Sequence, residues 1–326
     1  MAADGGKARS GGLVPSRSGF PWLTRVVWQV EMVDLSGQEP VLDGVGETAL
    51  WTLYHRSLAA RDPACGLADP KALELVQALD HPFTRRFGTD NRGWARGTAV
   101  RARCYDREMR AFLARHPRGT VVCLGEGLET QFWRVDNGTV QWLGVELAES
   151  AALRRRLLPD TDRRRTLTGS LLDERWMREV DASDGVLLLA QGVLMYVAWD
   201  RVRALVEVCA ERFPGAGLVF DTPPAWFAAG TARGRFRYPA GYRPPSMLWG
   251  MTPARLRELR GLPGVAAAIP VRVPRGAGLW WGRVVPAVDR VPVLRSYGPL
   301  SVTRLLFELV PRPAGPPPHD LHEDSL

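Results

Sequence analysis

The chain has 326 residues, of which 45% are hydrophobic and 24% are charged. This balance is that of an ordinary globular protein with enough apolar material for a core. No stretch approaches the roughly 18 to 20 apolar residues that a membrane-spanning helix needs, so we expect no membrane partner.

The net charge of +8 comes almost entirely from arginine, because Lys7 and Lys71 are the only lysines. Together with abundant Ala, Gly, Val and Pro, this pattern indicates the codon bias of a GC-rich genome more than nucleic-acid binding, and we expect no nucleic-acid partner. The two arginine triplets at 154–156 and 163–165 leave a basic patch open as an alternative. We expect them on a helix face and in the loop after it.

Four cysteines occur, at positions 65, 104, 123 and 209, and none has the C-x-x-C spacing of a zinc site. We therefore expect no metal. Cys123 and Cys209 lie in apolar runs and are predicted to be core residues. Unpaired, widely spaced cysteines are typical of the reducing cytoplasm, where we place the protein.

The first 118 residues predict a leader followed by helices. Residues 1–20 lack the apolar segment of a secretory signal and are expected to be a disordered leader. Residues 21–118 are expected to form a helical cap, with one helix ending before Pro63, one starting at Pro70 and one ending before Pro117.

From Thr120 the pattern alternates between strands and helices. Short apolar runs (VVCLG, QWLGVE, RRTLTGS, DGVLLLAQG and AGLVFDT) are separated by helical stretches. This series predicts an α/β fold with a doubly wound, mostly parallel, Rossmann-like sheet. We assign this core to 119–310, with a substrate-side insertion at about 223–275 and a disordered tail at 311–326. The late runs at 279–288 and 303–310 are predicted terminal strands.

The run VVCLGEGLET reads as a strand, a glycine turn and the start of a helix. Gly125 and Gly127 allow a sharp turn and close approach to a ligand, and a helix N-terminus offers free N–H groups. The next strand ends at Glu146, whose carboxylate is suited to accept from the hydroxyls of a ribose. A dinucleotide fingerprint has a third glycine where this chain has Thr130, which weakens the NAD interpretation. If the turn is considered by itself, the alternative that it is a structural turn without a function stays open.

Several motifs together carry a family resemblance from about Gly46 to about Val310. These are GETALWTLYHRSLAARDP, DPKALELVQALD, VRARCYD, VVCLGEGLETQFWRVDNG, SLLDERW, AQGVLMYV and RFPGAGLVFDTPPAWF. In this order they resemble the TcmP-like polyketide O-methyltransferases, relatives of leucine carboxyl methyltransferase. The resemblance implies a class I methyltransferase core with an N-terminal helical cap and S-adenosyl-L-methionine as cofactor.

The resemblance also implies roles for particular residues. Arg101 takes the position of the family's arginine for the carboxylate of the methionine moiety, and an arginine fork suits a carboxylate. Glu146 takes the position of the ribose-binding acid. The remaining cofactor-binding positions fall on Gly125, Glu126, Gly127, Ser170, Leu171 and Gln191.

Three of these positions depart from the family pattern. Glu126 stands where a small residue is more usual, and Ser170 replaces an acid on the adenine side. Gln191 replaces a Glu beside the cofactor, which removes a negative charge near the sulfonium and the amino group. These changes bear on the details of binding more than on the class of cofactor.

The chemistry depends on the acceptor oxygen. A carboxylate, with a pKa near ~4, is ionised at neutral pH and needs no general base, whereas a phenol with a pKa near ~10 does. Of the five histidines, His55 in the cap is more consistent with a packed helix residue than with a base. Tyr196 is expected near the pocket mouth, where it positions substrate or only packs. Six aromatic residues after the fifth strand either wall a pocket for a flat molecule or pack a loop: Trp226, Phe227, Phe236, Tyr238, Tyr242 and Trp249.

The leading prediction is O-methylation of a small molecule, a carboxylate or phenol of a polyketide-like secondary metabolite. The alternatives are methylation of a protein C-terminal carboxylate, a NAD-dependent oxidoreductase, and a non-catalytic S-adenosylmethionine-binding protein, which Gln191 keeps open. The sequence gives no indication of the oligomeric state.

Overall fold

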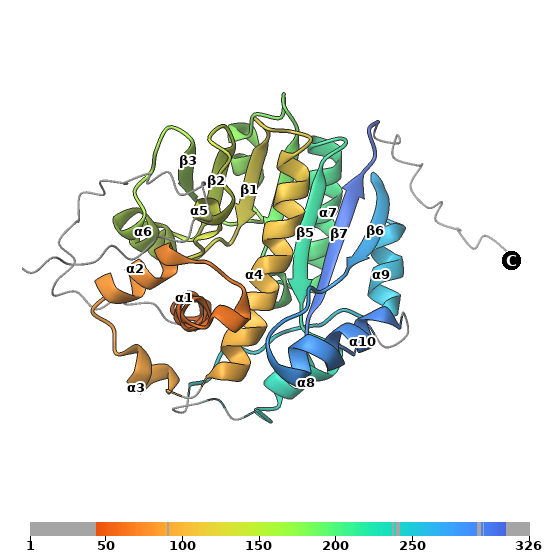
Figure 1. Ribbon diagram of the computed structural model, residues 1–326. Helices are drawn as coiled ribbons and strands as arrows, with labels where there is room; N and C mark the ends of the chain where they lie inside the picture. The colour runs from red at the N-terminus through yellow and green to blue at the C-terminus, as the bar shows by residue number, and fades with distance from the viewer. Residues whose placement is uncertain are drawn as a thin grey trace, which may run out of the picture. The chain divides into compact units, whose positions relative to one another are not determined.

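A seven-stranded sheet has the strand order β3-β2-β1-β4-β5-β7-β6. Its strands are β1 (Thr120–Leu124), β2 (Gln141–Glu146), β3 (Arg164–Thr168), β4 (Val186–Ala190), β5 (Gly217–Thr222), β6 (Val265–Val271) and β7 (Ser301–Phe307). The first five are parallel, whereas β7 runs antiparallel between β5 and β6 (Figure 1). The predicted doubly wound, mostly parallel sheet is therefore confirmed.

The computed structural model describes residues 44–89, 91–236, 238, 242–291, 295 and 297–310, all within one compact unit of the chain. The expected leader at 1–20 and tail at 311–326 lie outside the described residues. So does the first part of the expected helical cap, which is described from residue 44 onward.

Both faces of the sheet are buried, which explains the continuous apolar runs of its strands. Along β1, Val122 and Leu124 belong to one core cluster with residues of α7 (Trp199–Arg212), whereas Val121 and Cys123 belong to another. That second cluster contains Tyr105 and Met109 of α4 (Arg92–Leu113), the long helix that crosses one face of the sheet in Figure 1. The two-residue period of the strands thus divides their side chains between two helical layers.

The cap consists of α1 (Gly44–Arg61), α2 (Pro70–Ala78), α3 (Phe83–Phe87) and α4. Pro70 begins α2 as predicted, because the side chain of Asp69 accepts a hydrogen bond from the Ala72 N–H and proline needs no such bond at the first position. The short helix α3 was not predicted.

The other α-helices follow the strands. They are α5 (Gln131–Val135), α6 (Ala148–Leu157), α7, α8 (Ala225–Ala232), α9 (Pro253–Arg260) and α10 (Val285–Arg290). Within the described ranges, no helix is both long enough and apolar enough to span a membrane.

The prediction of a strand at 279–288 is wrong. Trp280–Val284 forms a π-helical turn that continues into α10. Val285 and Asp289 are buried while Leu279 and Trp280 are exposed, so one side of a helical turn contacts the protein. The strand predicted at 303–310 is confirmed as β7.

The prediction for 265–271 also needs correction. This segment was placed in the substrate-side insertion at 223–275, yet it forms β6 at the edge of the sheet. Its alanine-rich sequence has little strand character, and Pro270 is tolerated because an edge strand need not donate from every residue.

The arginine triplets differ from their predicted setting as well. Residues 154–156 lie on α6 as expected, but Arg164 and Arg165 lie in β3 and not in a loop. Arg154 and Arg164 are buried, and Arg163 forms an ion pair with Asp136. Two of the six side chains are therefore committed to the interior and not to a surface patch.

Candidate active site

A cavity of about 580 Å³ is lined by the carboxyl ends of β1, β2 and β4 together with α1, α4 and the segment after β5. The strand order reverses between β1 and β4, and a crevice at such a point is where doubly wound sheets bind ligands. All nine residues predicted for the site line this cavity: Arg101, Gly125, Glu126, Gly127, Glu146, Ser170, Leu171, Gln191 and Tyr196.

The turn after β1 requires its two glycines. Gly125 and Gly127 have φ angles of +67° and +52°, in the left-handed region that favours glycine. A Cβ atom on Gly125 would lie 2.7 Å from Cγ2 of Val193, and one on Gly127 would lie 3.1 Å from Cβ of Ala49. The turn is thus pressed between the loop after β4 and helix α1.

Glu146 lies at the end of β2 beside this turn. Its carboxylate accepts hydrogen bonds from the backbone N–H of Gly127 at 2.6 Å and of Leu147 at 3.0 Å. Burial raises the pKa of Glu146 above its usual range. The acid is therefore fixed at the cavity wall, with lone pairs left for a further donor.

The expected helix N-terminus does not directly follow the glycine turn. Helix α5 begins at Gln131 and has five residues, and the Gly127 N–H is already bound to Glu146. Thr130 precedes the helix, and its hydroxyl donates to the carboxylate of Asp69 at 2.7 to 2.8 Å. Fixed side chains, more than a helix terminus, shape this wall.

The side chain of Glu126 is turned into the protein. It pairs with Arg154 at 2.5 Å and accepts from Nε1 of Trp142 at 2.8 Å, with side chains of Glu126 and Arg154 that are 1% and 0% exposed. A Cβ on Gly144 would lie within 2.2 Å of its Oε2, so Gly144 makes room for it. Burial raises the pKa of Glu126, and Arg154 opposes this effect. Only the backbone position of Glu126 thus suits the predicted cofactor role.

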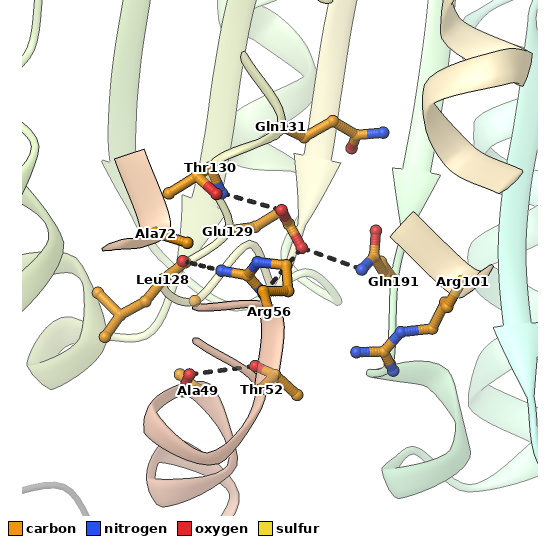
Figure 2. A network of polar contacts seen from close by, with 12 residues as sticks. Ala49, Thr52, Arg56, Ala72, Arg101, Leu128, Glu129, Thr130, Gln131 and Gln191 are labelled. Atoms are coloured by element: carbon orange, nitrogen blue, oxygen red, sulfur yellow. Dashed lines mark hydrogen bonds and ion pairs between the residues drawn. The ribbon is translucent and has the colours of Figure 1, made fainter. Parts of the chain in front are cut away.

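A buried ionic network centres on Glu129 (Figure 2). Its carboxylate contacts Arg56 at 3.0 Å and Arg134 at 3.1 Å, and Arg134 also pairs with Asp69 and Asp106. Although burial opposes its ionisation, Arg56 and Arg134 lower the pKa of Glu129 to about 2. Glu129 therefore carries a permanent negative charge at the cavity wall.

Gln191, just after β4, extends this network into the cavity. Its Nε2 donates to Oε2 of Glu129 at 3.0 Å, while its Oε1 is buried and has no partner among the described residues. Rotating the amide by half a turn would set an oxygen against the Glu129 carboxylate, so the contact fixes which end of the amide stays free. The free end is an acceptor.

Arg101 projects from α4 near Gln191 (Figure 2). Its Nη1 lies 3.6 Å from Oδ2 of Asp221, and Asp221 in turn accepts from the Tyr105 hydroxyl at 2.7 Å and the Gly192 N–H at 2.8 Å. The buried Nε of Arg101 has no partner within the described part of the chain. Arg101 is thus held by one weak ion pair and retains donors for an anionic group.

Comparison with known proteins decides the family. The chain is 32% identical over 192 residues to the tetracenomycin polyketide synthesis O-methyltransferase TcmP of Streptomyces glaucescens, which covers 58% of this chain and 70% of that protein. The chain belongs to the TcmP-like methyltransferase family. It is therefore a methyltransferase, and its cofactor is S-adenosylmethionine. No family model matches the sequence.

Solved structures similar to this methyltransferase include a DUF574 family protein from Streptomyces avermitilis, with a TM-score of 0.44, 16% identity and coverage of 72% of this chain and 94% of that one. A geranyl diphosphate methyltransferase in complex with S-adenosylmethionine has a TM-score of 0.40, 13% identity and coverage of 76% and 94%. Magnesium protoporphyrin IX methyltransferase from Synechocystis PCC 6803 has a TM-score of 0.38, 11% identity and coverage of 64% and 85%.

On the side of the cavity beyond Glu146, the TcmP-like chain presents two leucines. Leu147 is 60% exposed and lines the cavity, as does the half-buried Leu171. The Oγ of Ser170 accepts from the Leu172 N–H at 3.2 Å, which leaves its hydroxyl proton for another partner. Leu147 was not predicted to line the cavity, although its position directly after the acid at the end of β2 could have indicated it.

A large part of the cavity lining is aromatic, and this part is called the aromatic end below. Of the six aromatic residues proposed from the sequence, Trp226, Phe227, Tyr238 and Tyr242 line it, whereas Phe236 stacks on Phe227 with ring centroids 4.4 Å apart. Trp249 lies in the core. Three further tryptophans that line the cavity were not predicted: Trp51, Trp94 and Trp281.

Among the described residues that line the cavity, there is no histidine that could act as a base. His55 is fully buried and outside the cavity lining, its Nδ1–H donates to the Trp51 carbonyl at 2.7 Å, and burial lowers its pKa to about 4. Tyr196 lies in a 3₁₀ turn (Leu194–Tyr196), and burial raises its pKa to about 12. At neutral pH His55 stays neutral and Tyr196 stays protonated.

Proposed function

We propose that this methyltransferase transfers a methyl group to an oxygen of a small, flat molecule, a carboxylate or phenol of a polyketide-like secondary metabolite. The observation that carries the proposal is that one cavity is lined both by an ionic cluster, which includes Glu129 and Gln191 and is called the ionic end below, and by a cluster of contacting aromatic rings, which includes Trp51, Trp94 and Tyr242. The predicted cytoplasmic location belongs to the same proposal, as does the absence of a nucleic-acid partner.

The ionic end fits S-adenosylmethionine. We assign the ribose hydroxyls to Glu146, the adenine side to Ser170 and Leu171, and the carboxylate of the methionine moiety to Arg101. The backbone of 125–127 forms the floor of this site. The unpartnered Oε1 of Gln191 is the acceptor that a cofactor ammonium group needs.

The charge of this end favours a cation. Three guanidinium groups, those of Arg56, Arg101 and Arg134, face four carboxylates, those of Asp69, Asp106, Glu129 and Asp221. One negative charge is left over, and S-adenosylmethionine, with a sulfonium, an ammonium group and a carboxylate, has the single net positive charge that compensates it. A glutamate at 191 would add a second negative charge 3.0 Å from Glu129, which explains why glutamine suits this chain.

The aromatic end supports an acceptor that is already ionised. Among the described lining residues, the titratable groups there are tyrosines, and burial raises the pKa of Tyr196 and of Tyr238 to about 12. A carboxylate needs no proton removed, so it matches a pocket without a histidine base better than an ordinary phenol.

S-adenosylmethionine, when bound, would supply a methyl carbon to which an acceptor oxygen bonds while the carbon–sulfur bond breaks and the neutral sulfide leaves in line. The protein's part is to hold the acceptor oxygen on that line and to keep water out. Trp51, Trp94 and Trp226 line the cavity, and so does Tyr196, which we assign to substrate positioning.

Calorimetry tests the cofactor assignment first. We expect S-adenosylhomocysteine to bind and NAD not to bind, and the reverse result would refute the proposal. Labelled S-adenosylmethionine is then offered with an aromatic carboxylic acid, with a phenol and with a peptide bearing a free C-terminal carboxylate. Mild alkali releases label from methyl esters and not from ethers, which separates the two acceptors. Labelling of the peptide alone would favour the protein carboxyl methyltransferase alternative, and cofactor binding without any labelled product would favour a non-catalytic protein.

A further inference from the structure

A second cavity, of about 400 Å³, lies beside α4 and shares no lining residue with the first cavity. Its volume is in the range of pockets that bind small molecules. Five of its nine described lining residues are charged: Arg103, Asp106, Arg107, Arg110 and Arg134. Four cations against one acid make the lining positive, and methyl transfer in the first cavity gives this lining no role.

Three of these arginines lie on one side of α4. Positions 103, 107 and 110 are four and three residues apart, a spacing that brings side chains together and at which like charges destabilise a helix. Arg107 contacts Glu108 at 3.5 Å, and Glu108 also pairs with Arg304 at 2.9 Å. Within the described part of the chain, Arg103 and Arg110 have no carboxylate at ion-pair distance. The protein itself therefore does not offset the repulsion among the three arginines.

The acid in the lining does not neutralise them either. Asp106 has a side chain that is 4% exposed, and its two oxygens accept from Arg134 at 3.0 and 3.1 Å. Arg134 is 3% exposed and also pairs with Asp69 and Glu129. This buried pair forms a wall whose charges are matched inside the protein. The three arginines of α4 keep their surplus charge for the cavity.

Backbone carbonyls hold the three guanidinium groups in place. Each donates at least one hydrogen bond to a carbonyl oxygen: Arg103 to Arg275 at 2.8 Å, Arg107 to Arg272 at 2.6 Å and Arg110 to Arg134 at 2.9 Å. A guanidinium has five N–H donors, so each group keeps donors for a ligand. Donors that are already positioned lose little freedom when an anion binds.

The arrangement selects among anions. An arginine fork matches the oxygens of phosphate and carboxylate groups. A phosphate presents oxygens in several directions, as a cavity with three guanidinium groups requires, whereas a carboxylate presents two oxygens in one plane. Arg103 and Arg110 are two helical turns apart, or ~10 Å along α4, so a ligand that reaches both carries charge on more than one centre.

We propose that the second cavity binds a diphosphate group, either as free pyrophosphate or as part of a nucleoside diphosphate. The proposal depends neither on the methyl acceptor nor on the cofactor assignment, because the two cavities have no lining residue in common.

Calorimetry on the full chain tests this site at an ionic strength of roughly 0.15 M, which screens weak attraction between exposed charges. We expect pyrophosphate to bind saturably, at one molecule per chain, and more tightly than succinate. Arg103→Gln/Arg110→Gln should weaken this binding roughly a hundredfold, because each lost hydrogen bond to a charged group changes affinity about tenfold or more. ADP identifies the source of the diphosphate. Tighter binding than pyrophosphate indicates a nucleotide, and equal or weaker binding indicates the free anion.

Arg201→Gln/Arg203→Gln is the matched control, because it removes two exposed charges from α7, the helix on the other face of the sheet. It should bind pyrophosphate within about twofold of the wild type. Arg110→Gln alone leaves the contacts of Arg103 in place and should weaken binding about tenfold, so it serves as the test if circular dichroism shows the double variant to be unfolded. No saturable binding by the wild type, tighter binding of succinate, an unchanged affinity in Arg110→Gln, or an equal loss in the control would each overturn the proposal.

Discussion

Arg154→Met should destabilise the protein because it leaves the buried Glu126 carboxylate without a counter-charge. A second substitution should restore part of the lost stability. In the wild type, Glu126 and Arg154 are 2.5 Å apart with almost no exposed surface. Without the guanidinium, the Glu126 carboxylate either stays charged in the interior or takes up a proton. Protonation sets the upper limit on the cost, which is about 4 kcal/mol at pH 7 for an acid with an unfolded pKa near ~4.3.

The double variant Arg154→Met/Glu126→Gln isolates this contribution. Its neutral amide still accepts from Trp142, so it should be more stable than Arg154→Met by up to about 4 kcal/mol at pH 7. The raised pKa of Glu126 in Arg154→Met lowers the stability of that variant only as the pH rises above ~4.3. The difference in unfolding free energy between the two variants should therefore shrink to about 1 kcal/mol at pH 5. The double variant should still be less stable than the wild type, because the carbonyls of Gly127 and Glu129 also lose the Arg154 donor.

Urea unfolding at pH 7 and pH 5 measures both variants against the wild type. Glu126→Gln alone serves as the control and should be destabilised by roughly 3 to 5 kcal/mol, because it leaves Arg154 buried without a counter-charge. A double variant no more stable than Arg154→Met, or a gap that does not depend on pH, would refute this account of the pair.

Four further outcomes follow from the site. Arg101→Ala should weaken S-adenosylhomocysteine binding about ten- to hundredfold in calorimetry, since it removes hydrogen bonds to a charged group, and unchanged affinity would remove Arg101 from the cofactor site. Gln191→Leu keeps the side-chain volume but removes the acceptor, so it should weaken S-adenosylhomocysteine binding in the same calorimetric assay. A weakening of less than twofold would contradict the role of the Gln191 Oε1. Because the pKa of His55 is about 4 in the folded chain and ~6.5 when unfolded, the wild type should lose about 2 kcal/mol of stability between pH 6.5 and 5. In His55→Gln most of that loss of stability should be absent. A loss equal to that of the wild type would refute the assignment of the pH dependence to His55. With a carboxylate acceptor, kcat should be flat from pH 6 to 9, and a rise across pH 7 would indicate a general base.

The parts of the fold that local pattern dictates were predictable. Wholly apolar runs marked β1 and β4 because strands covered on both faces bury every side chain. The end of each strand then placed Gly125, Glu146 and Gln191 at one edge, and all three line the cavity. The run at 279–288 failed because a short apolar run does not reveal its period, and its two buried residues, Val285 and Pro286, lie in a helix.

The ionic network was beyond prediction for a different reason. Arg56, Asp69, Asp106 and Arg134 come from four separate elements of the cap and core, and their pairing with Glu129 depends on the tertiary fold. Nothing in a chain with 43 basic residues, nearly all arginine, distinguishes an arginine that will be buried from one that will face solvent. From the sequence, Gln191 therefore indicated the loss of a negative charge, although the charged carboxylate of Glu129 accepts a hydrogen bond from its side chain.

In the function proposed above, the ionic and the aromatic parts of the cavity have different roles in methyl transfer. At the ionic end, the surplus negative charge of the Glu129 and Asp221 clusters favours a cationic cofactor over a neutral one. Methyl transfer consumes that cation, so the same charge favours exchange of the neutral sulfide product for fresh cofactor. At the aromatic end, the hydroxyls of Tyr196 and Tyr242 remain protonated and cannot remove a proton from the acceptor. A substrate that arrives already ionised needs no such group, and a carboxylic acid on a flat aromatic frame meets both conditions.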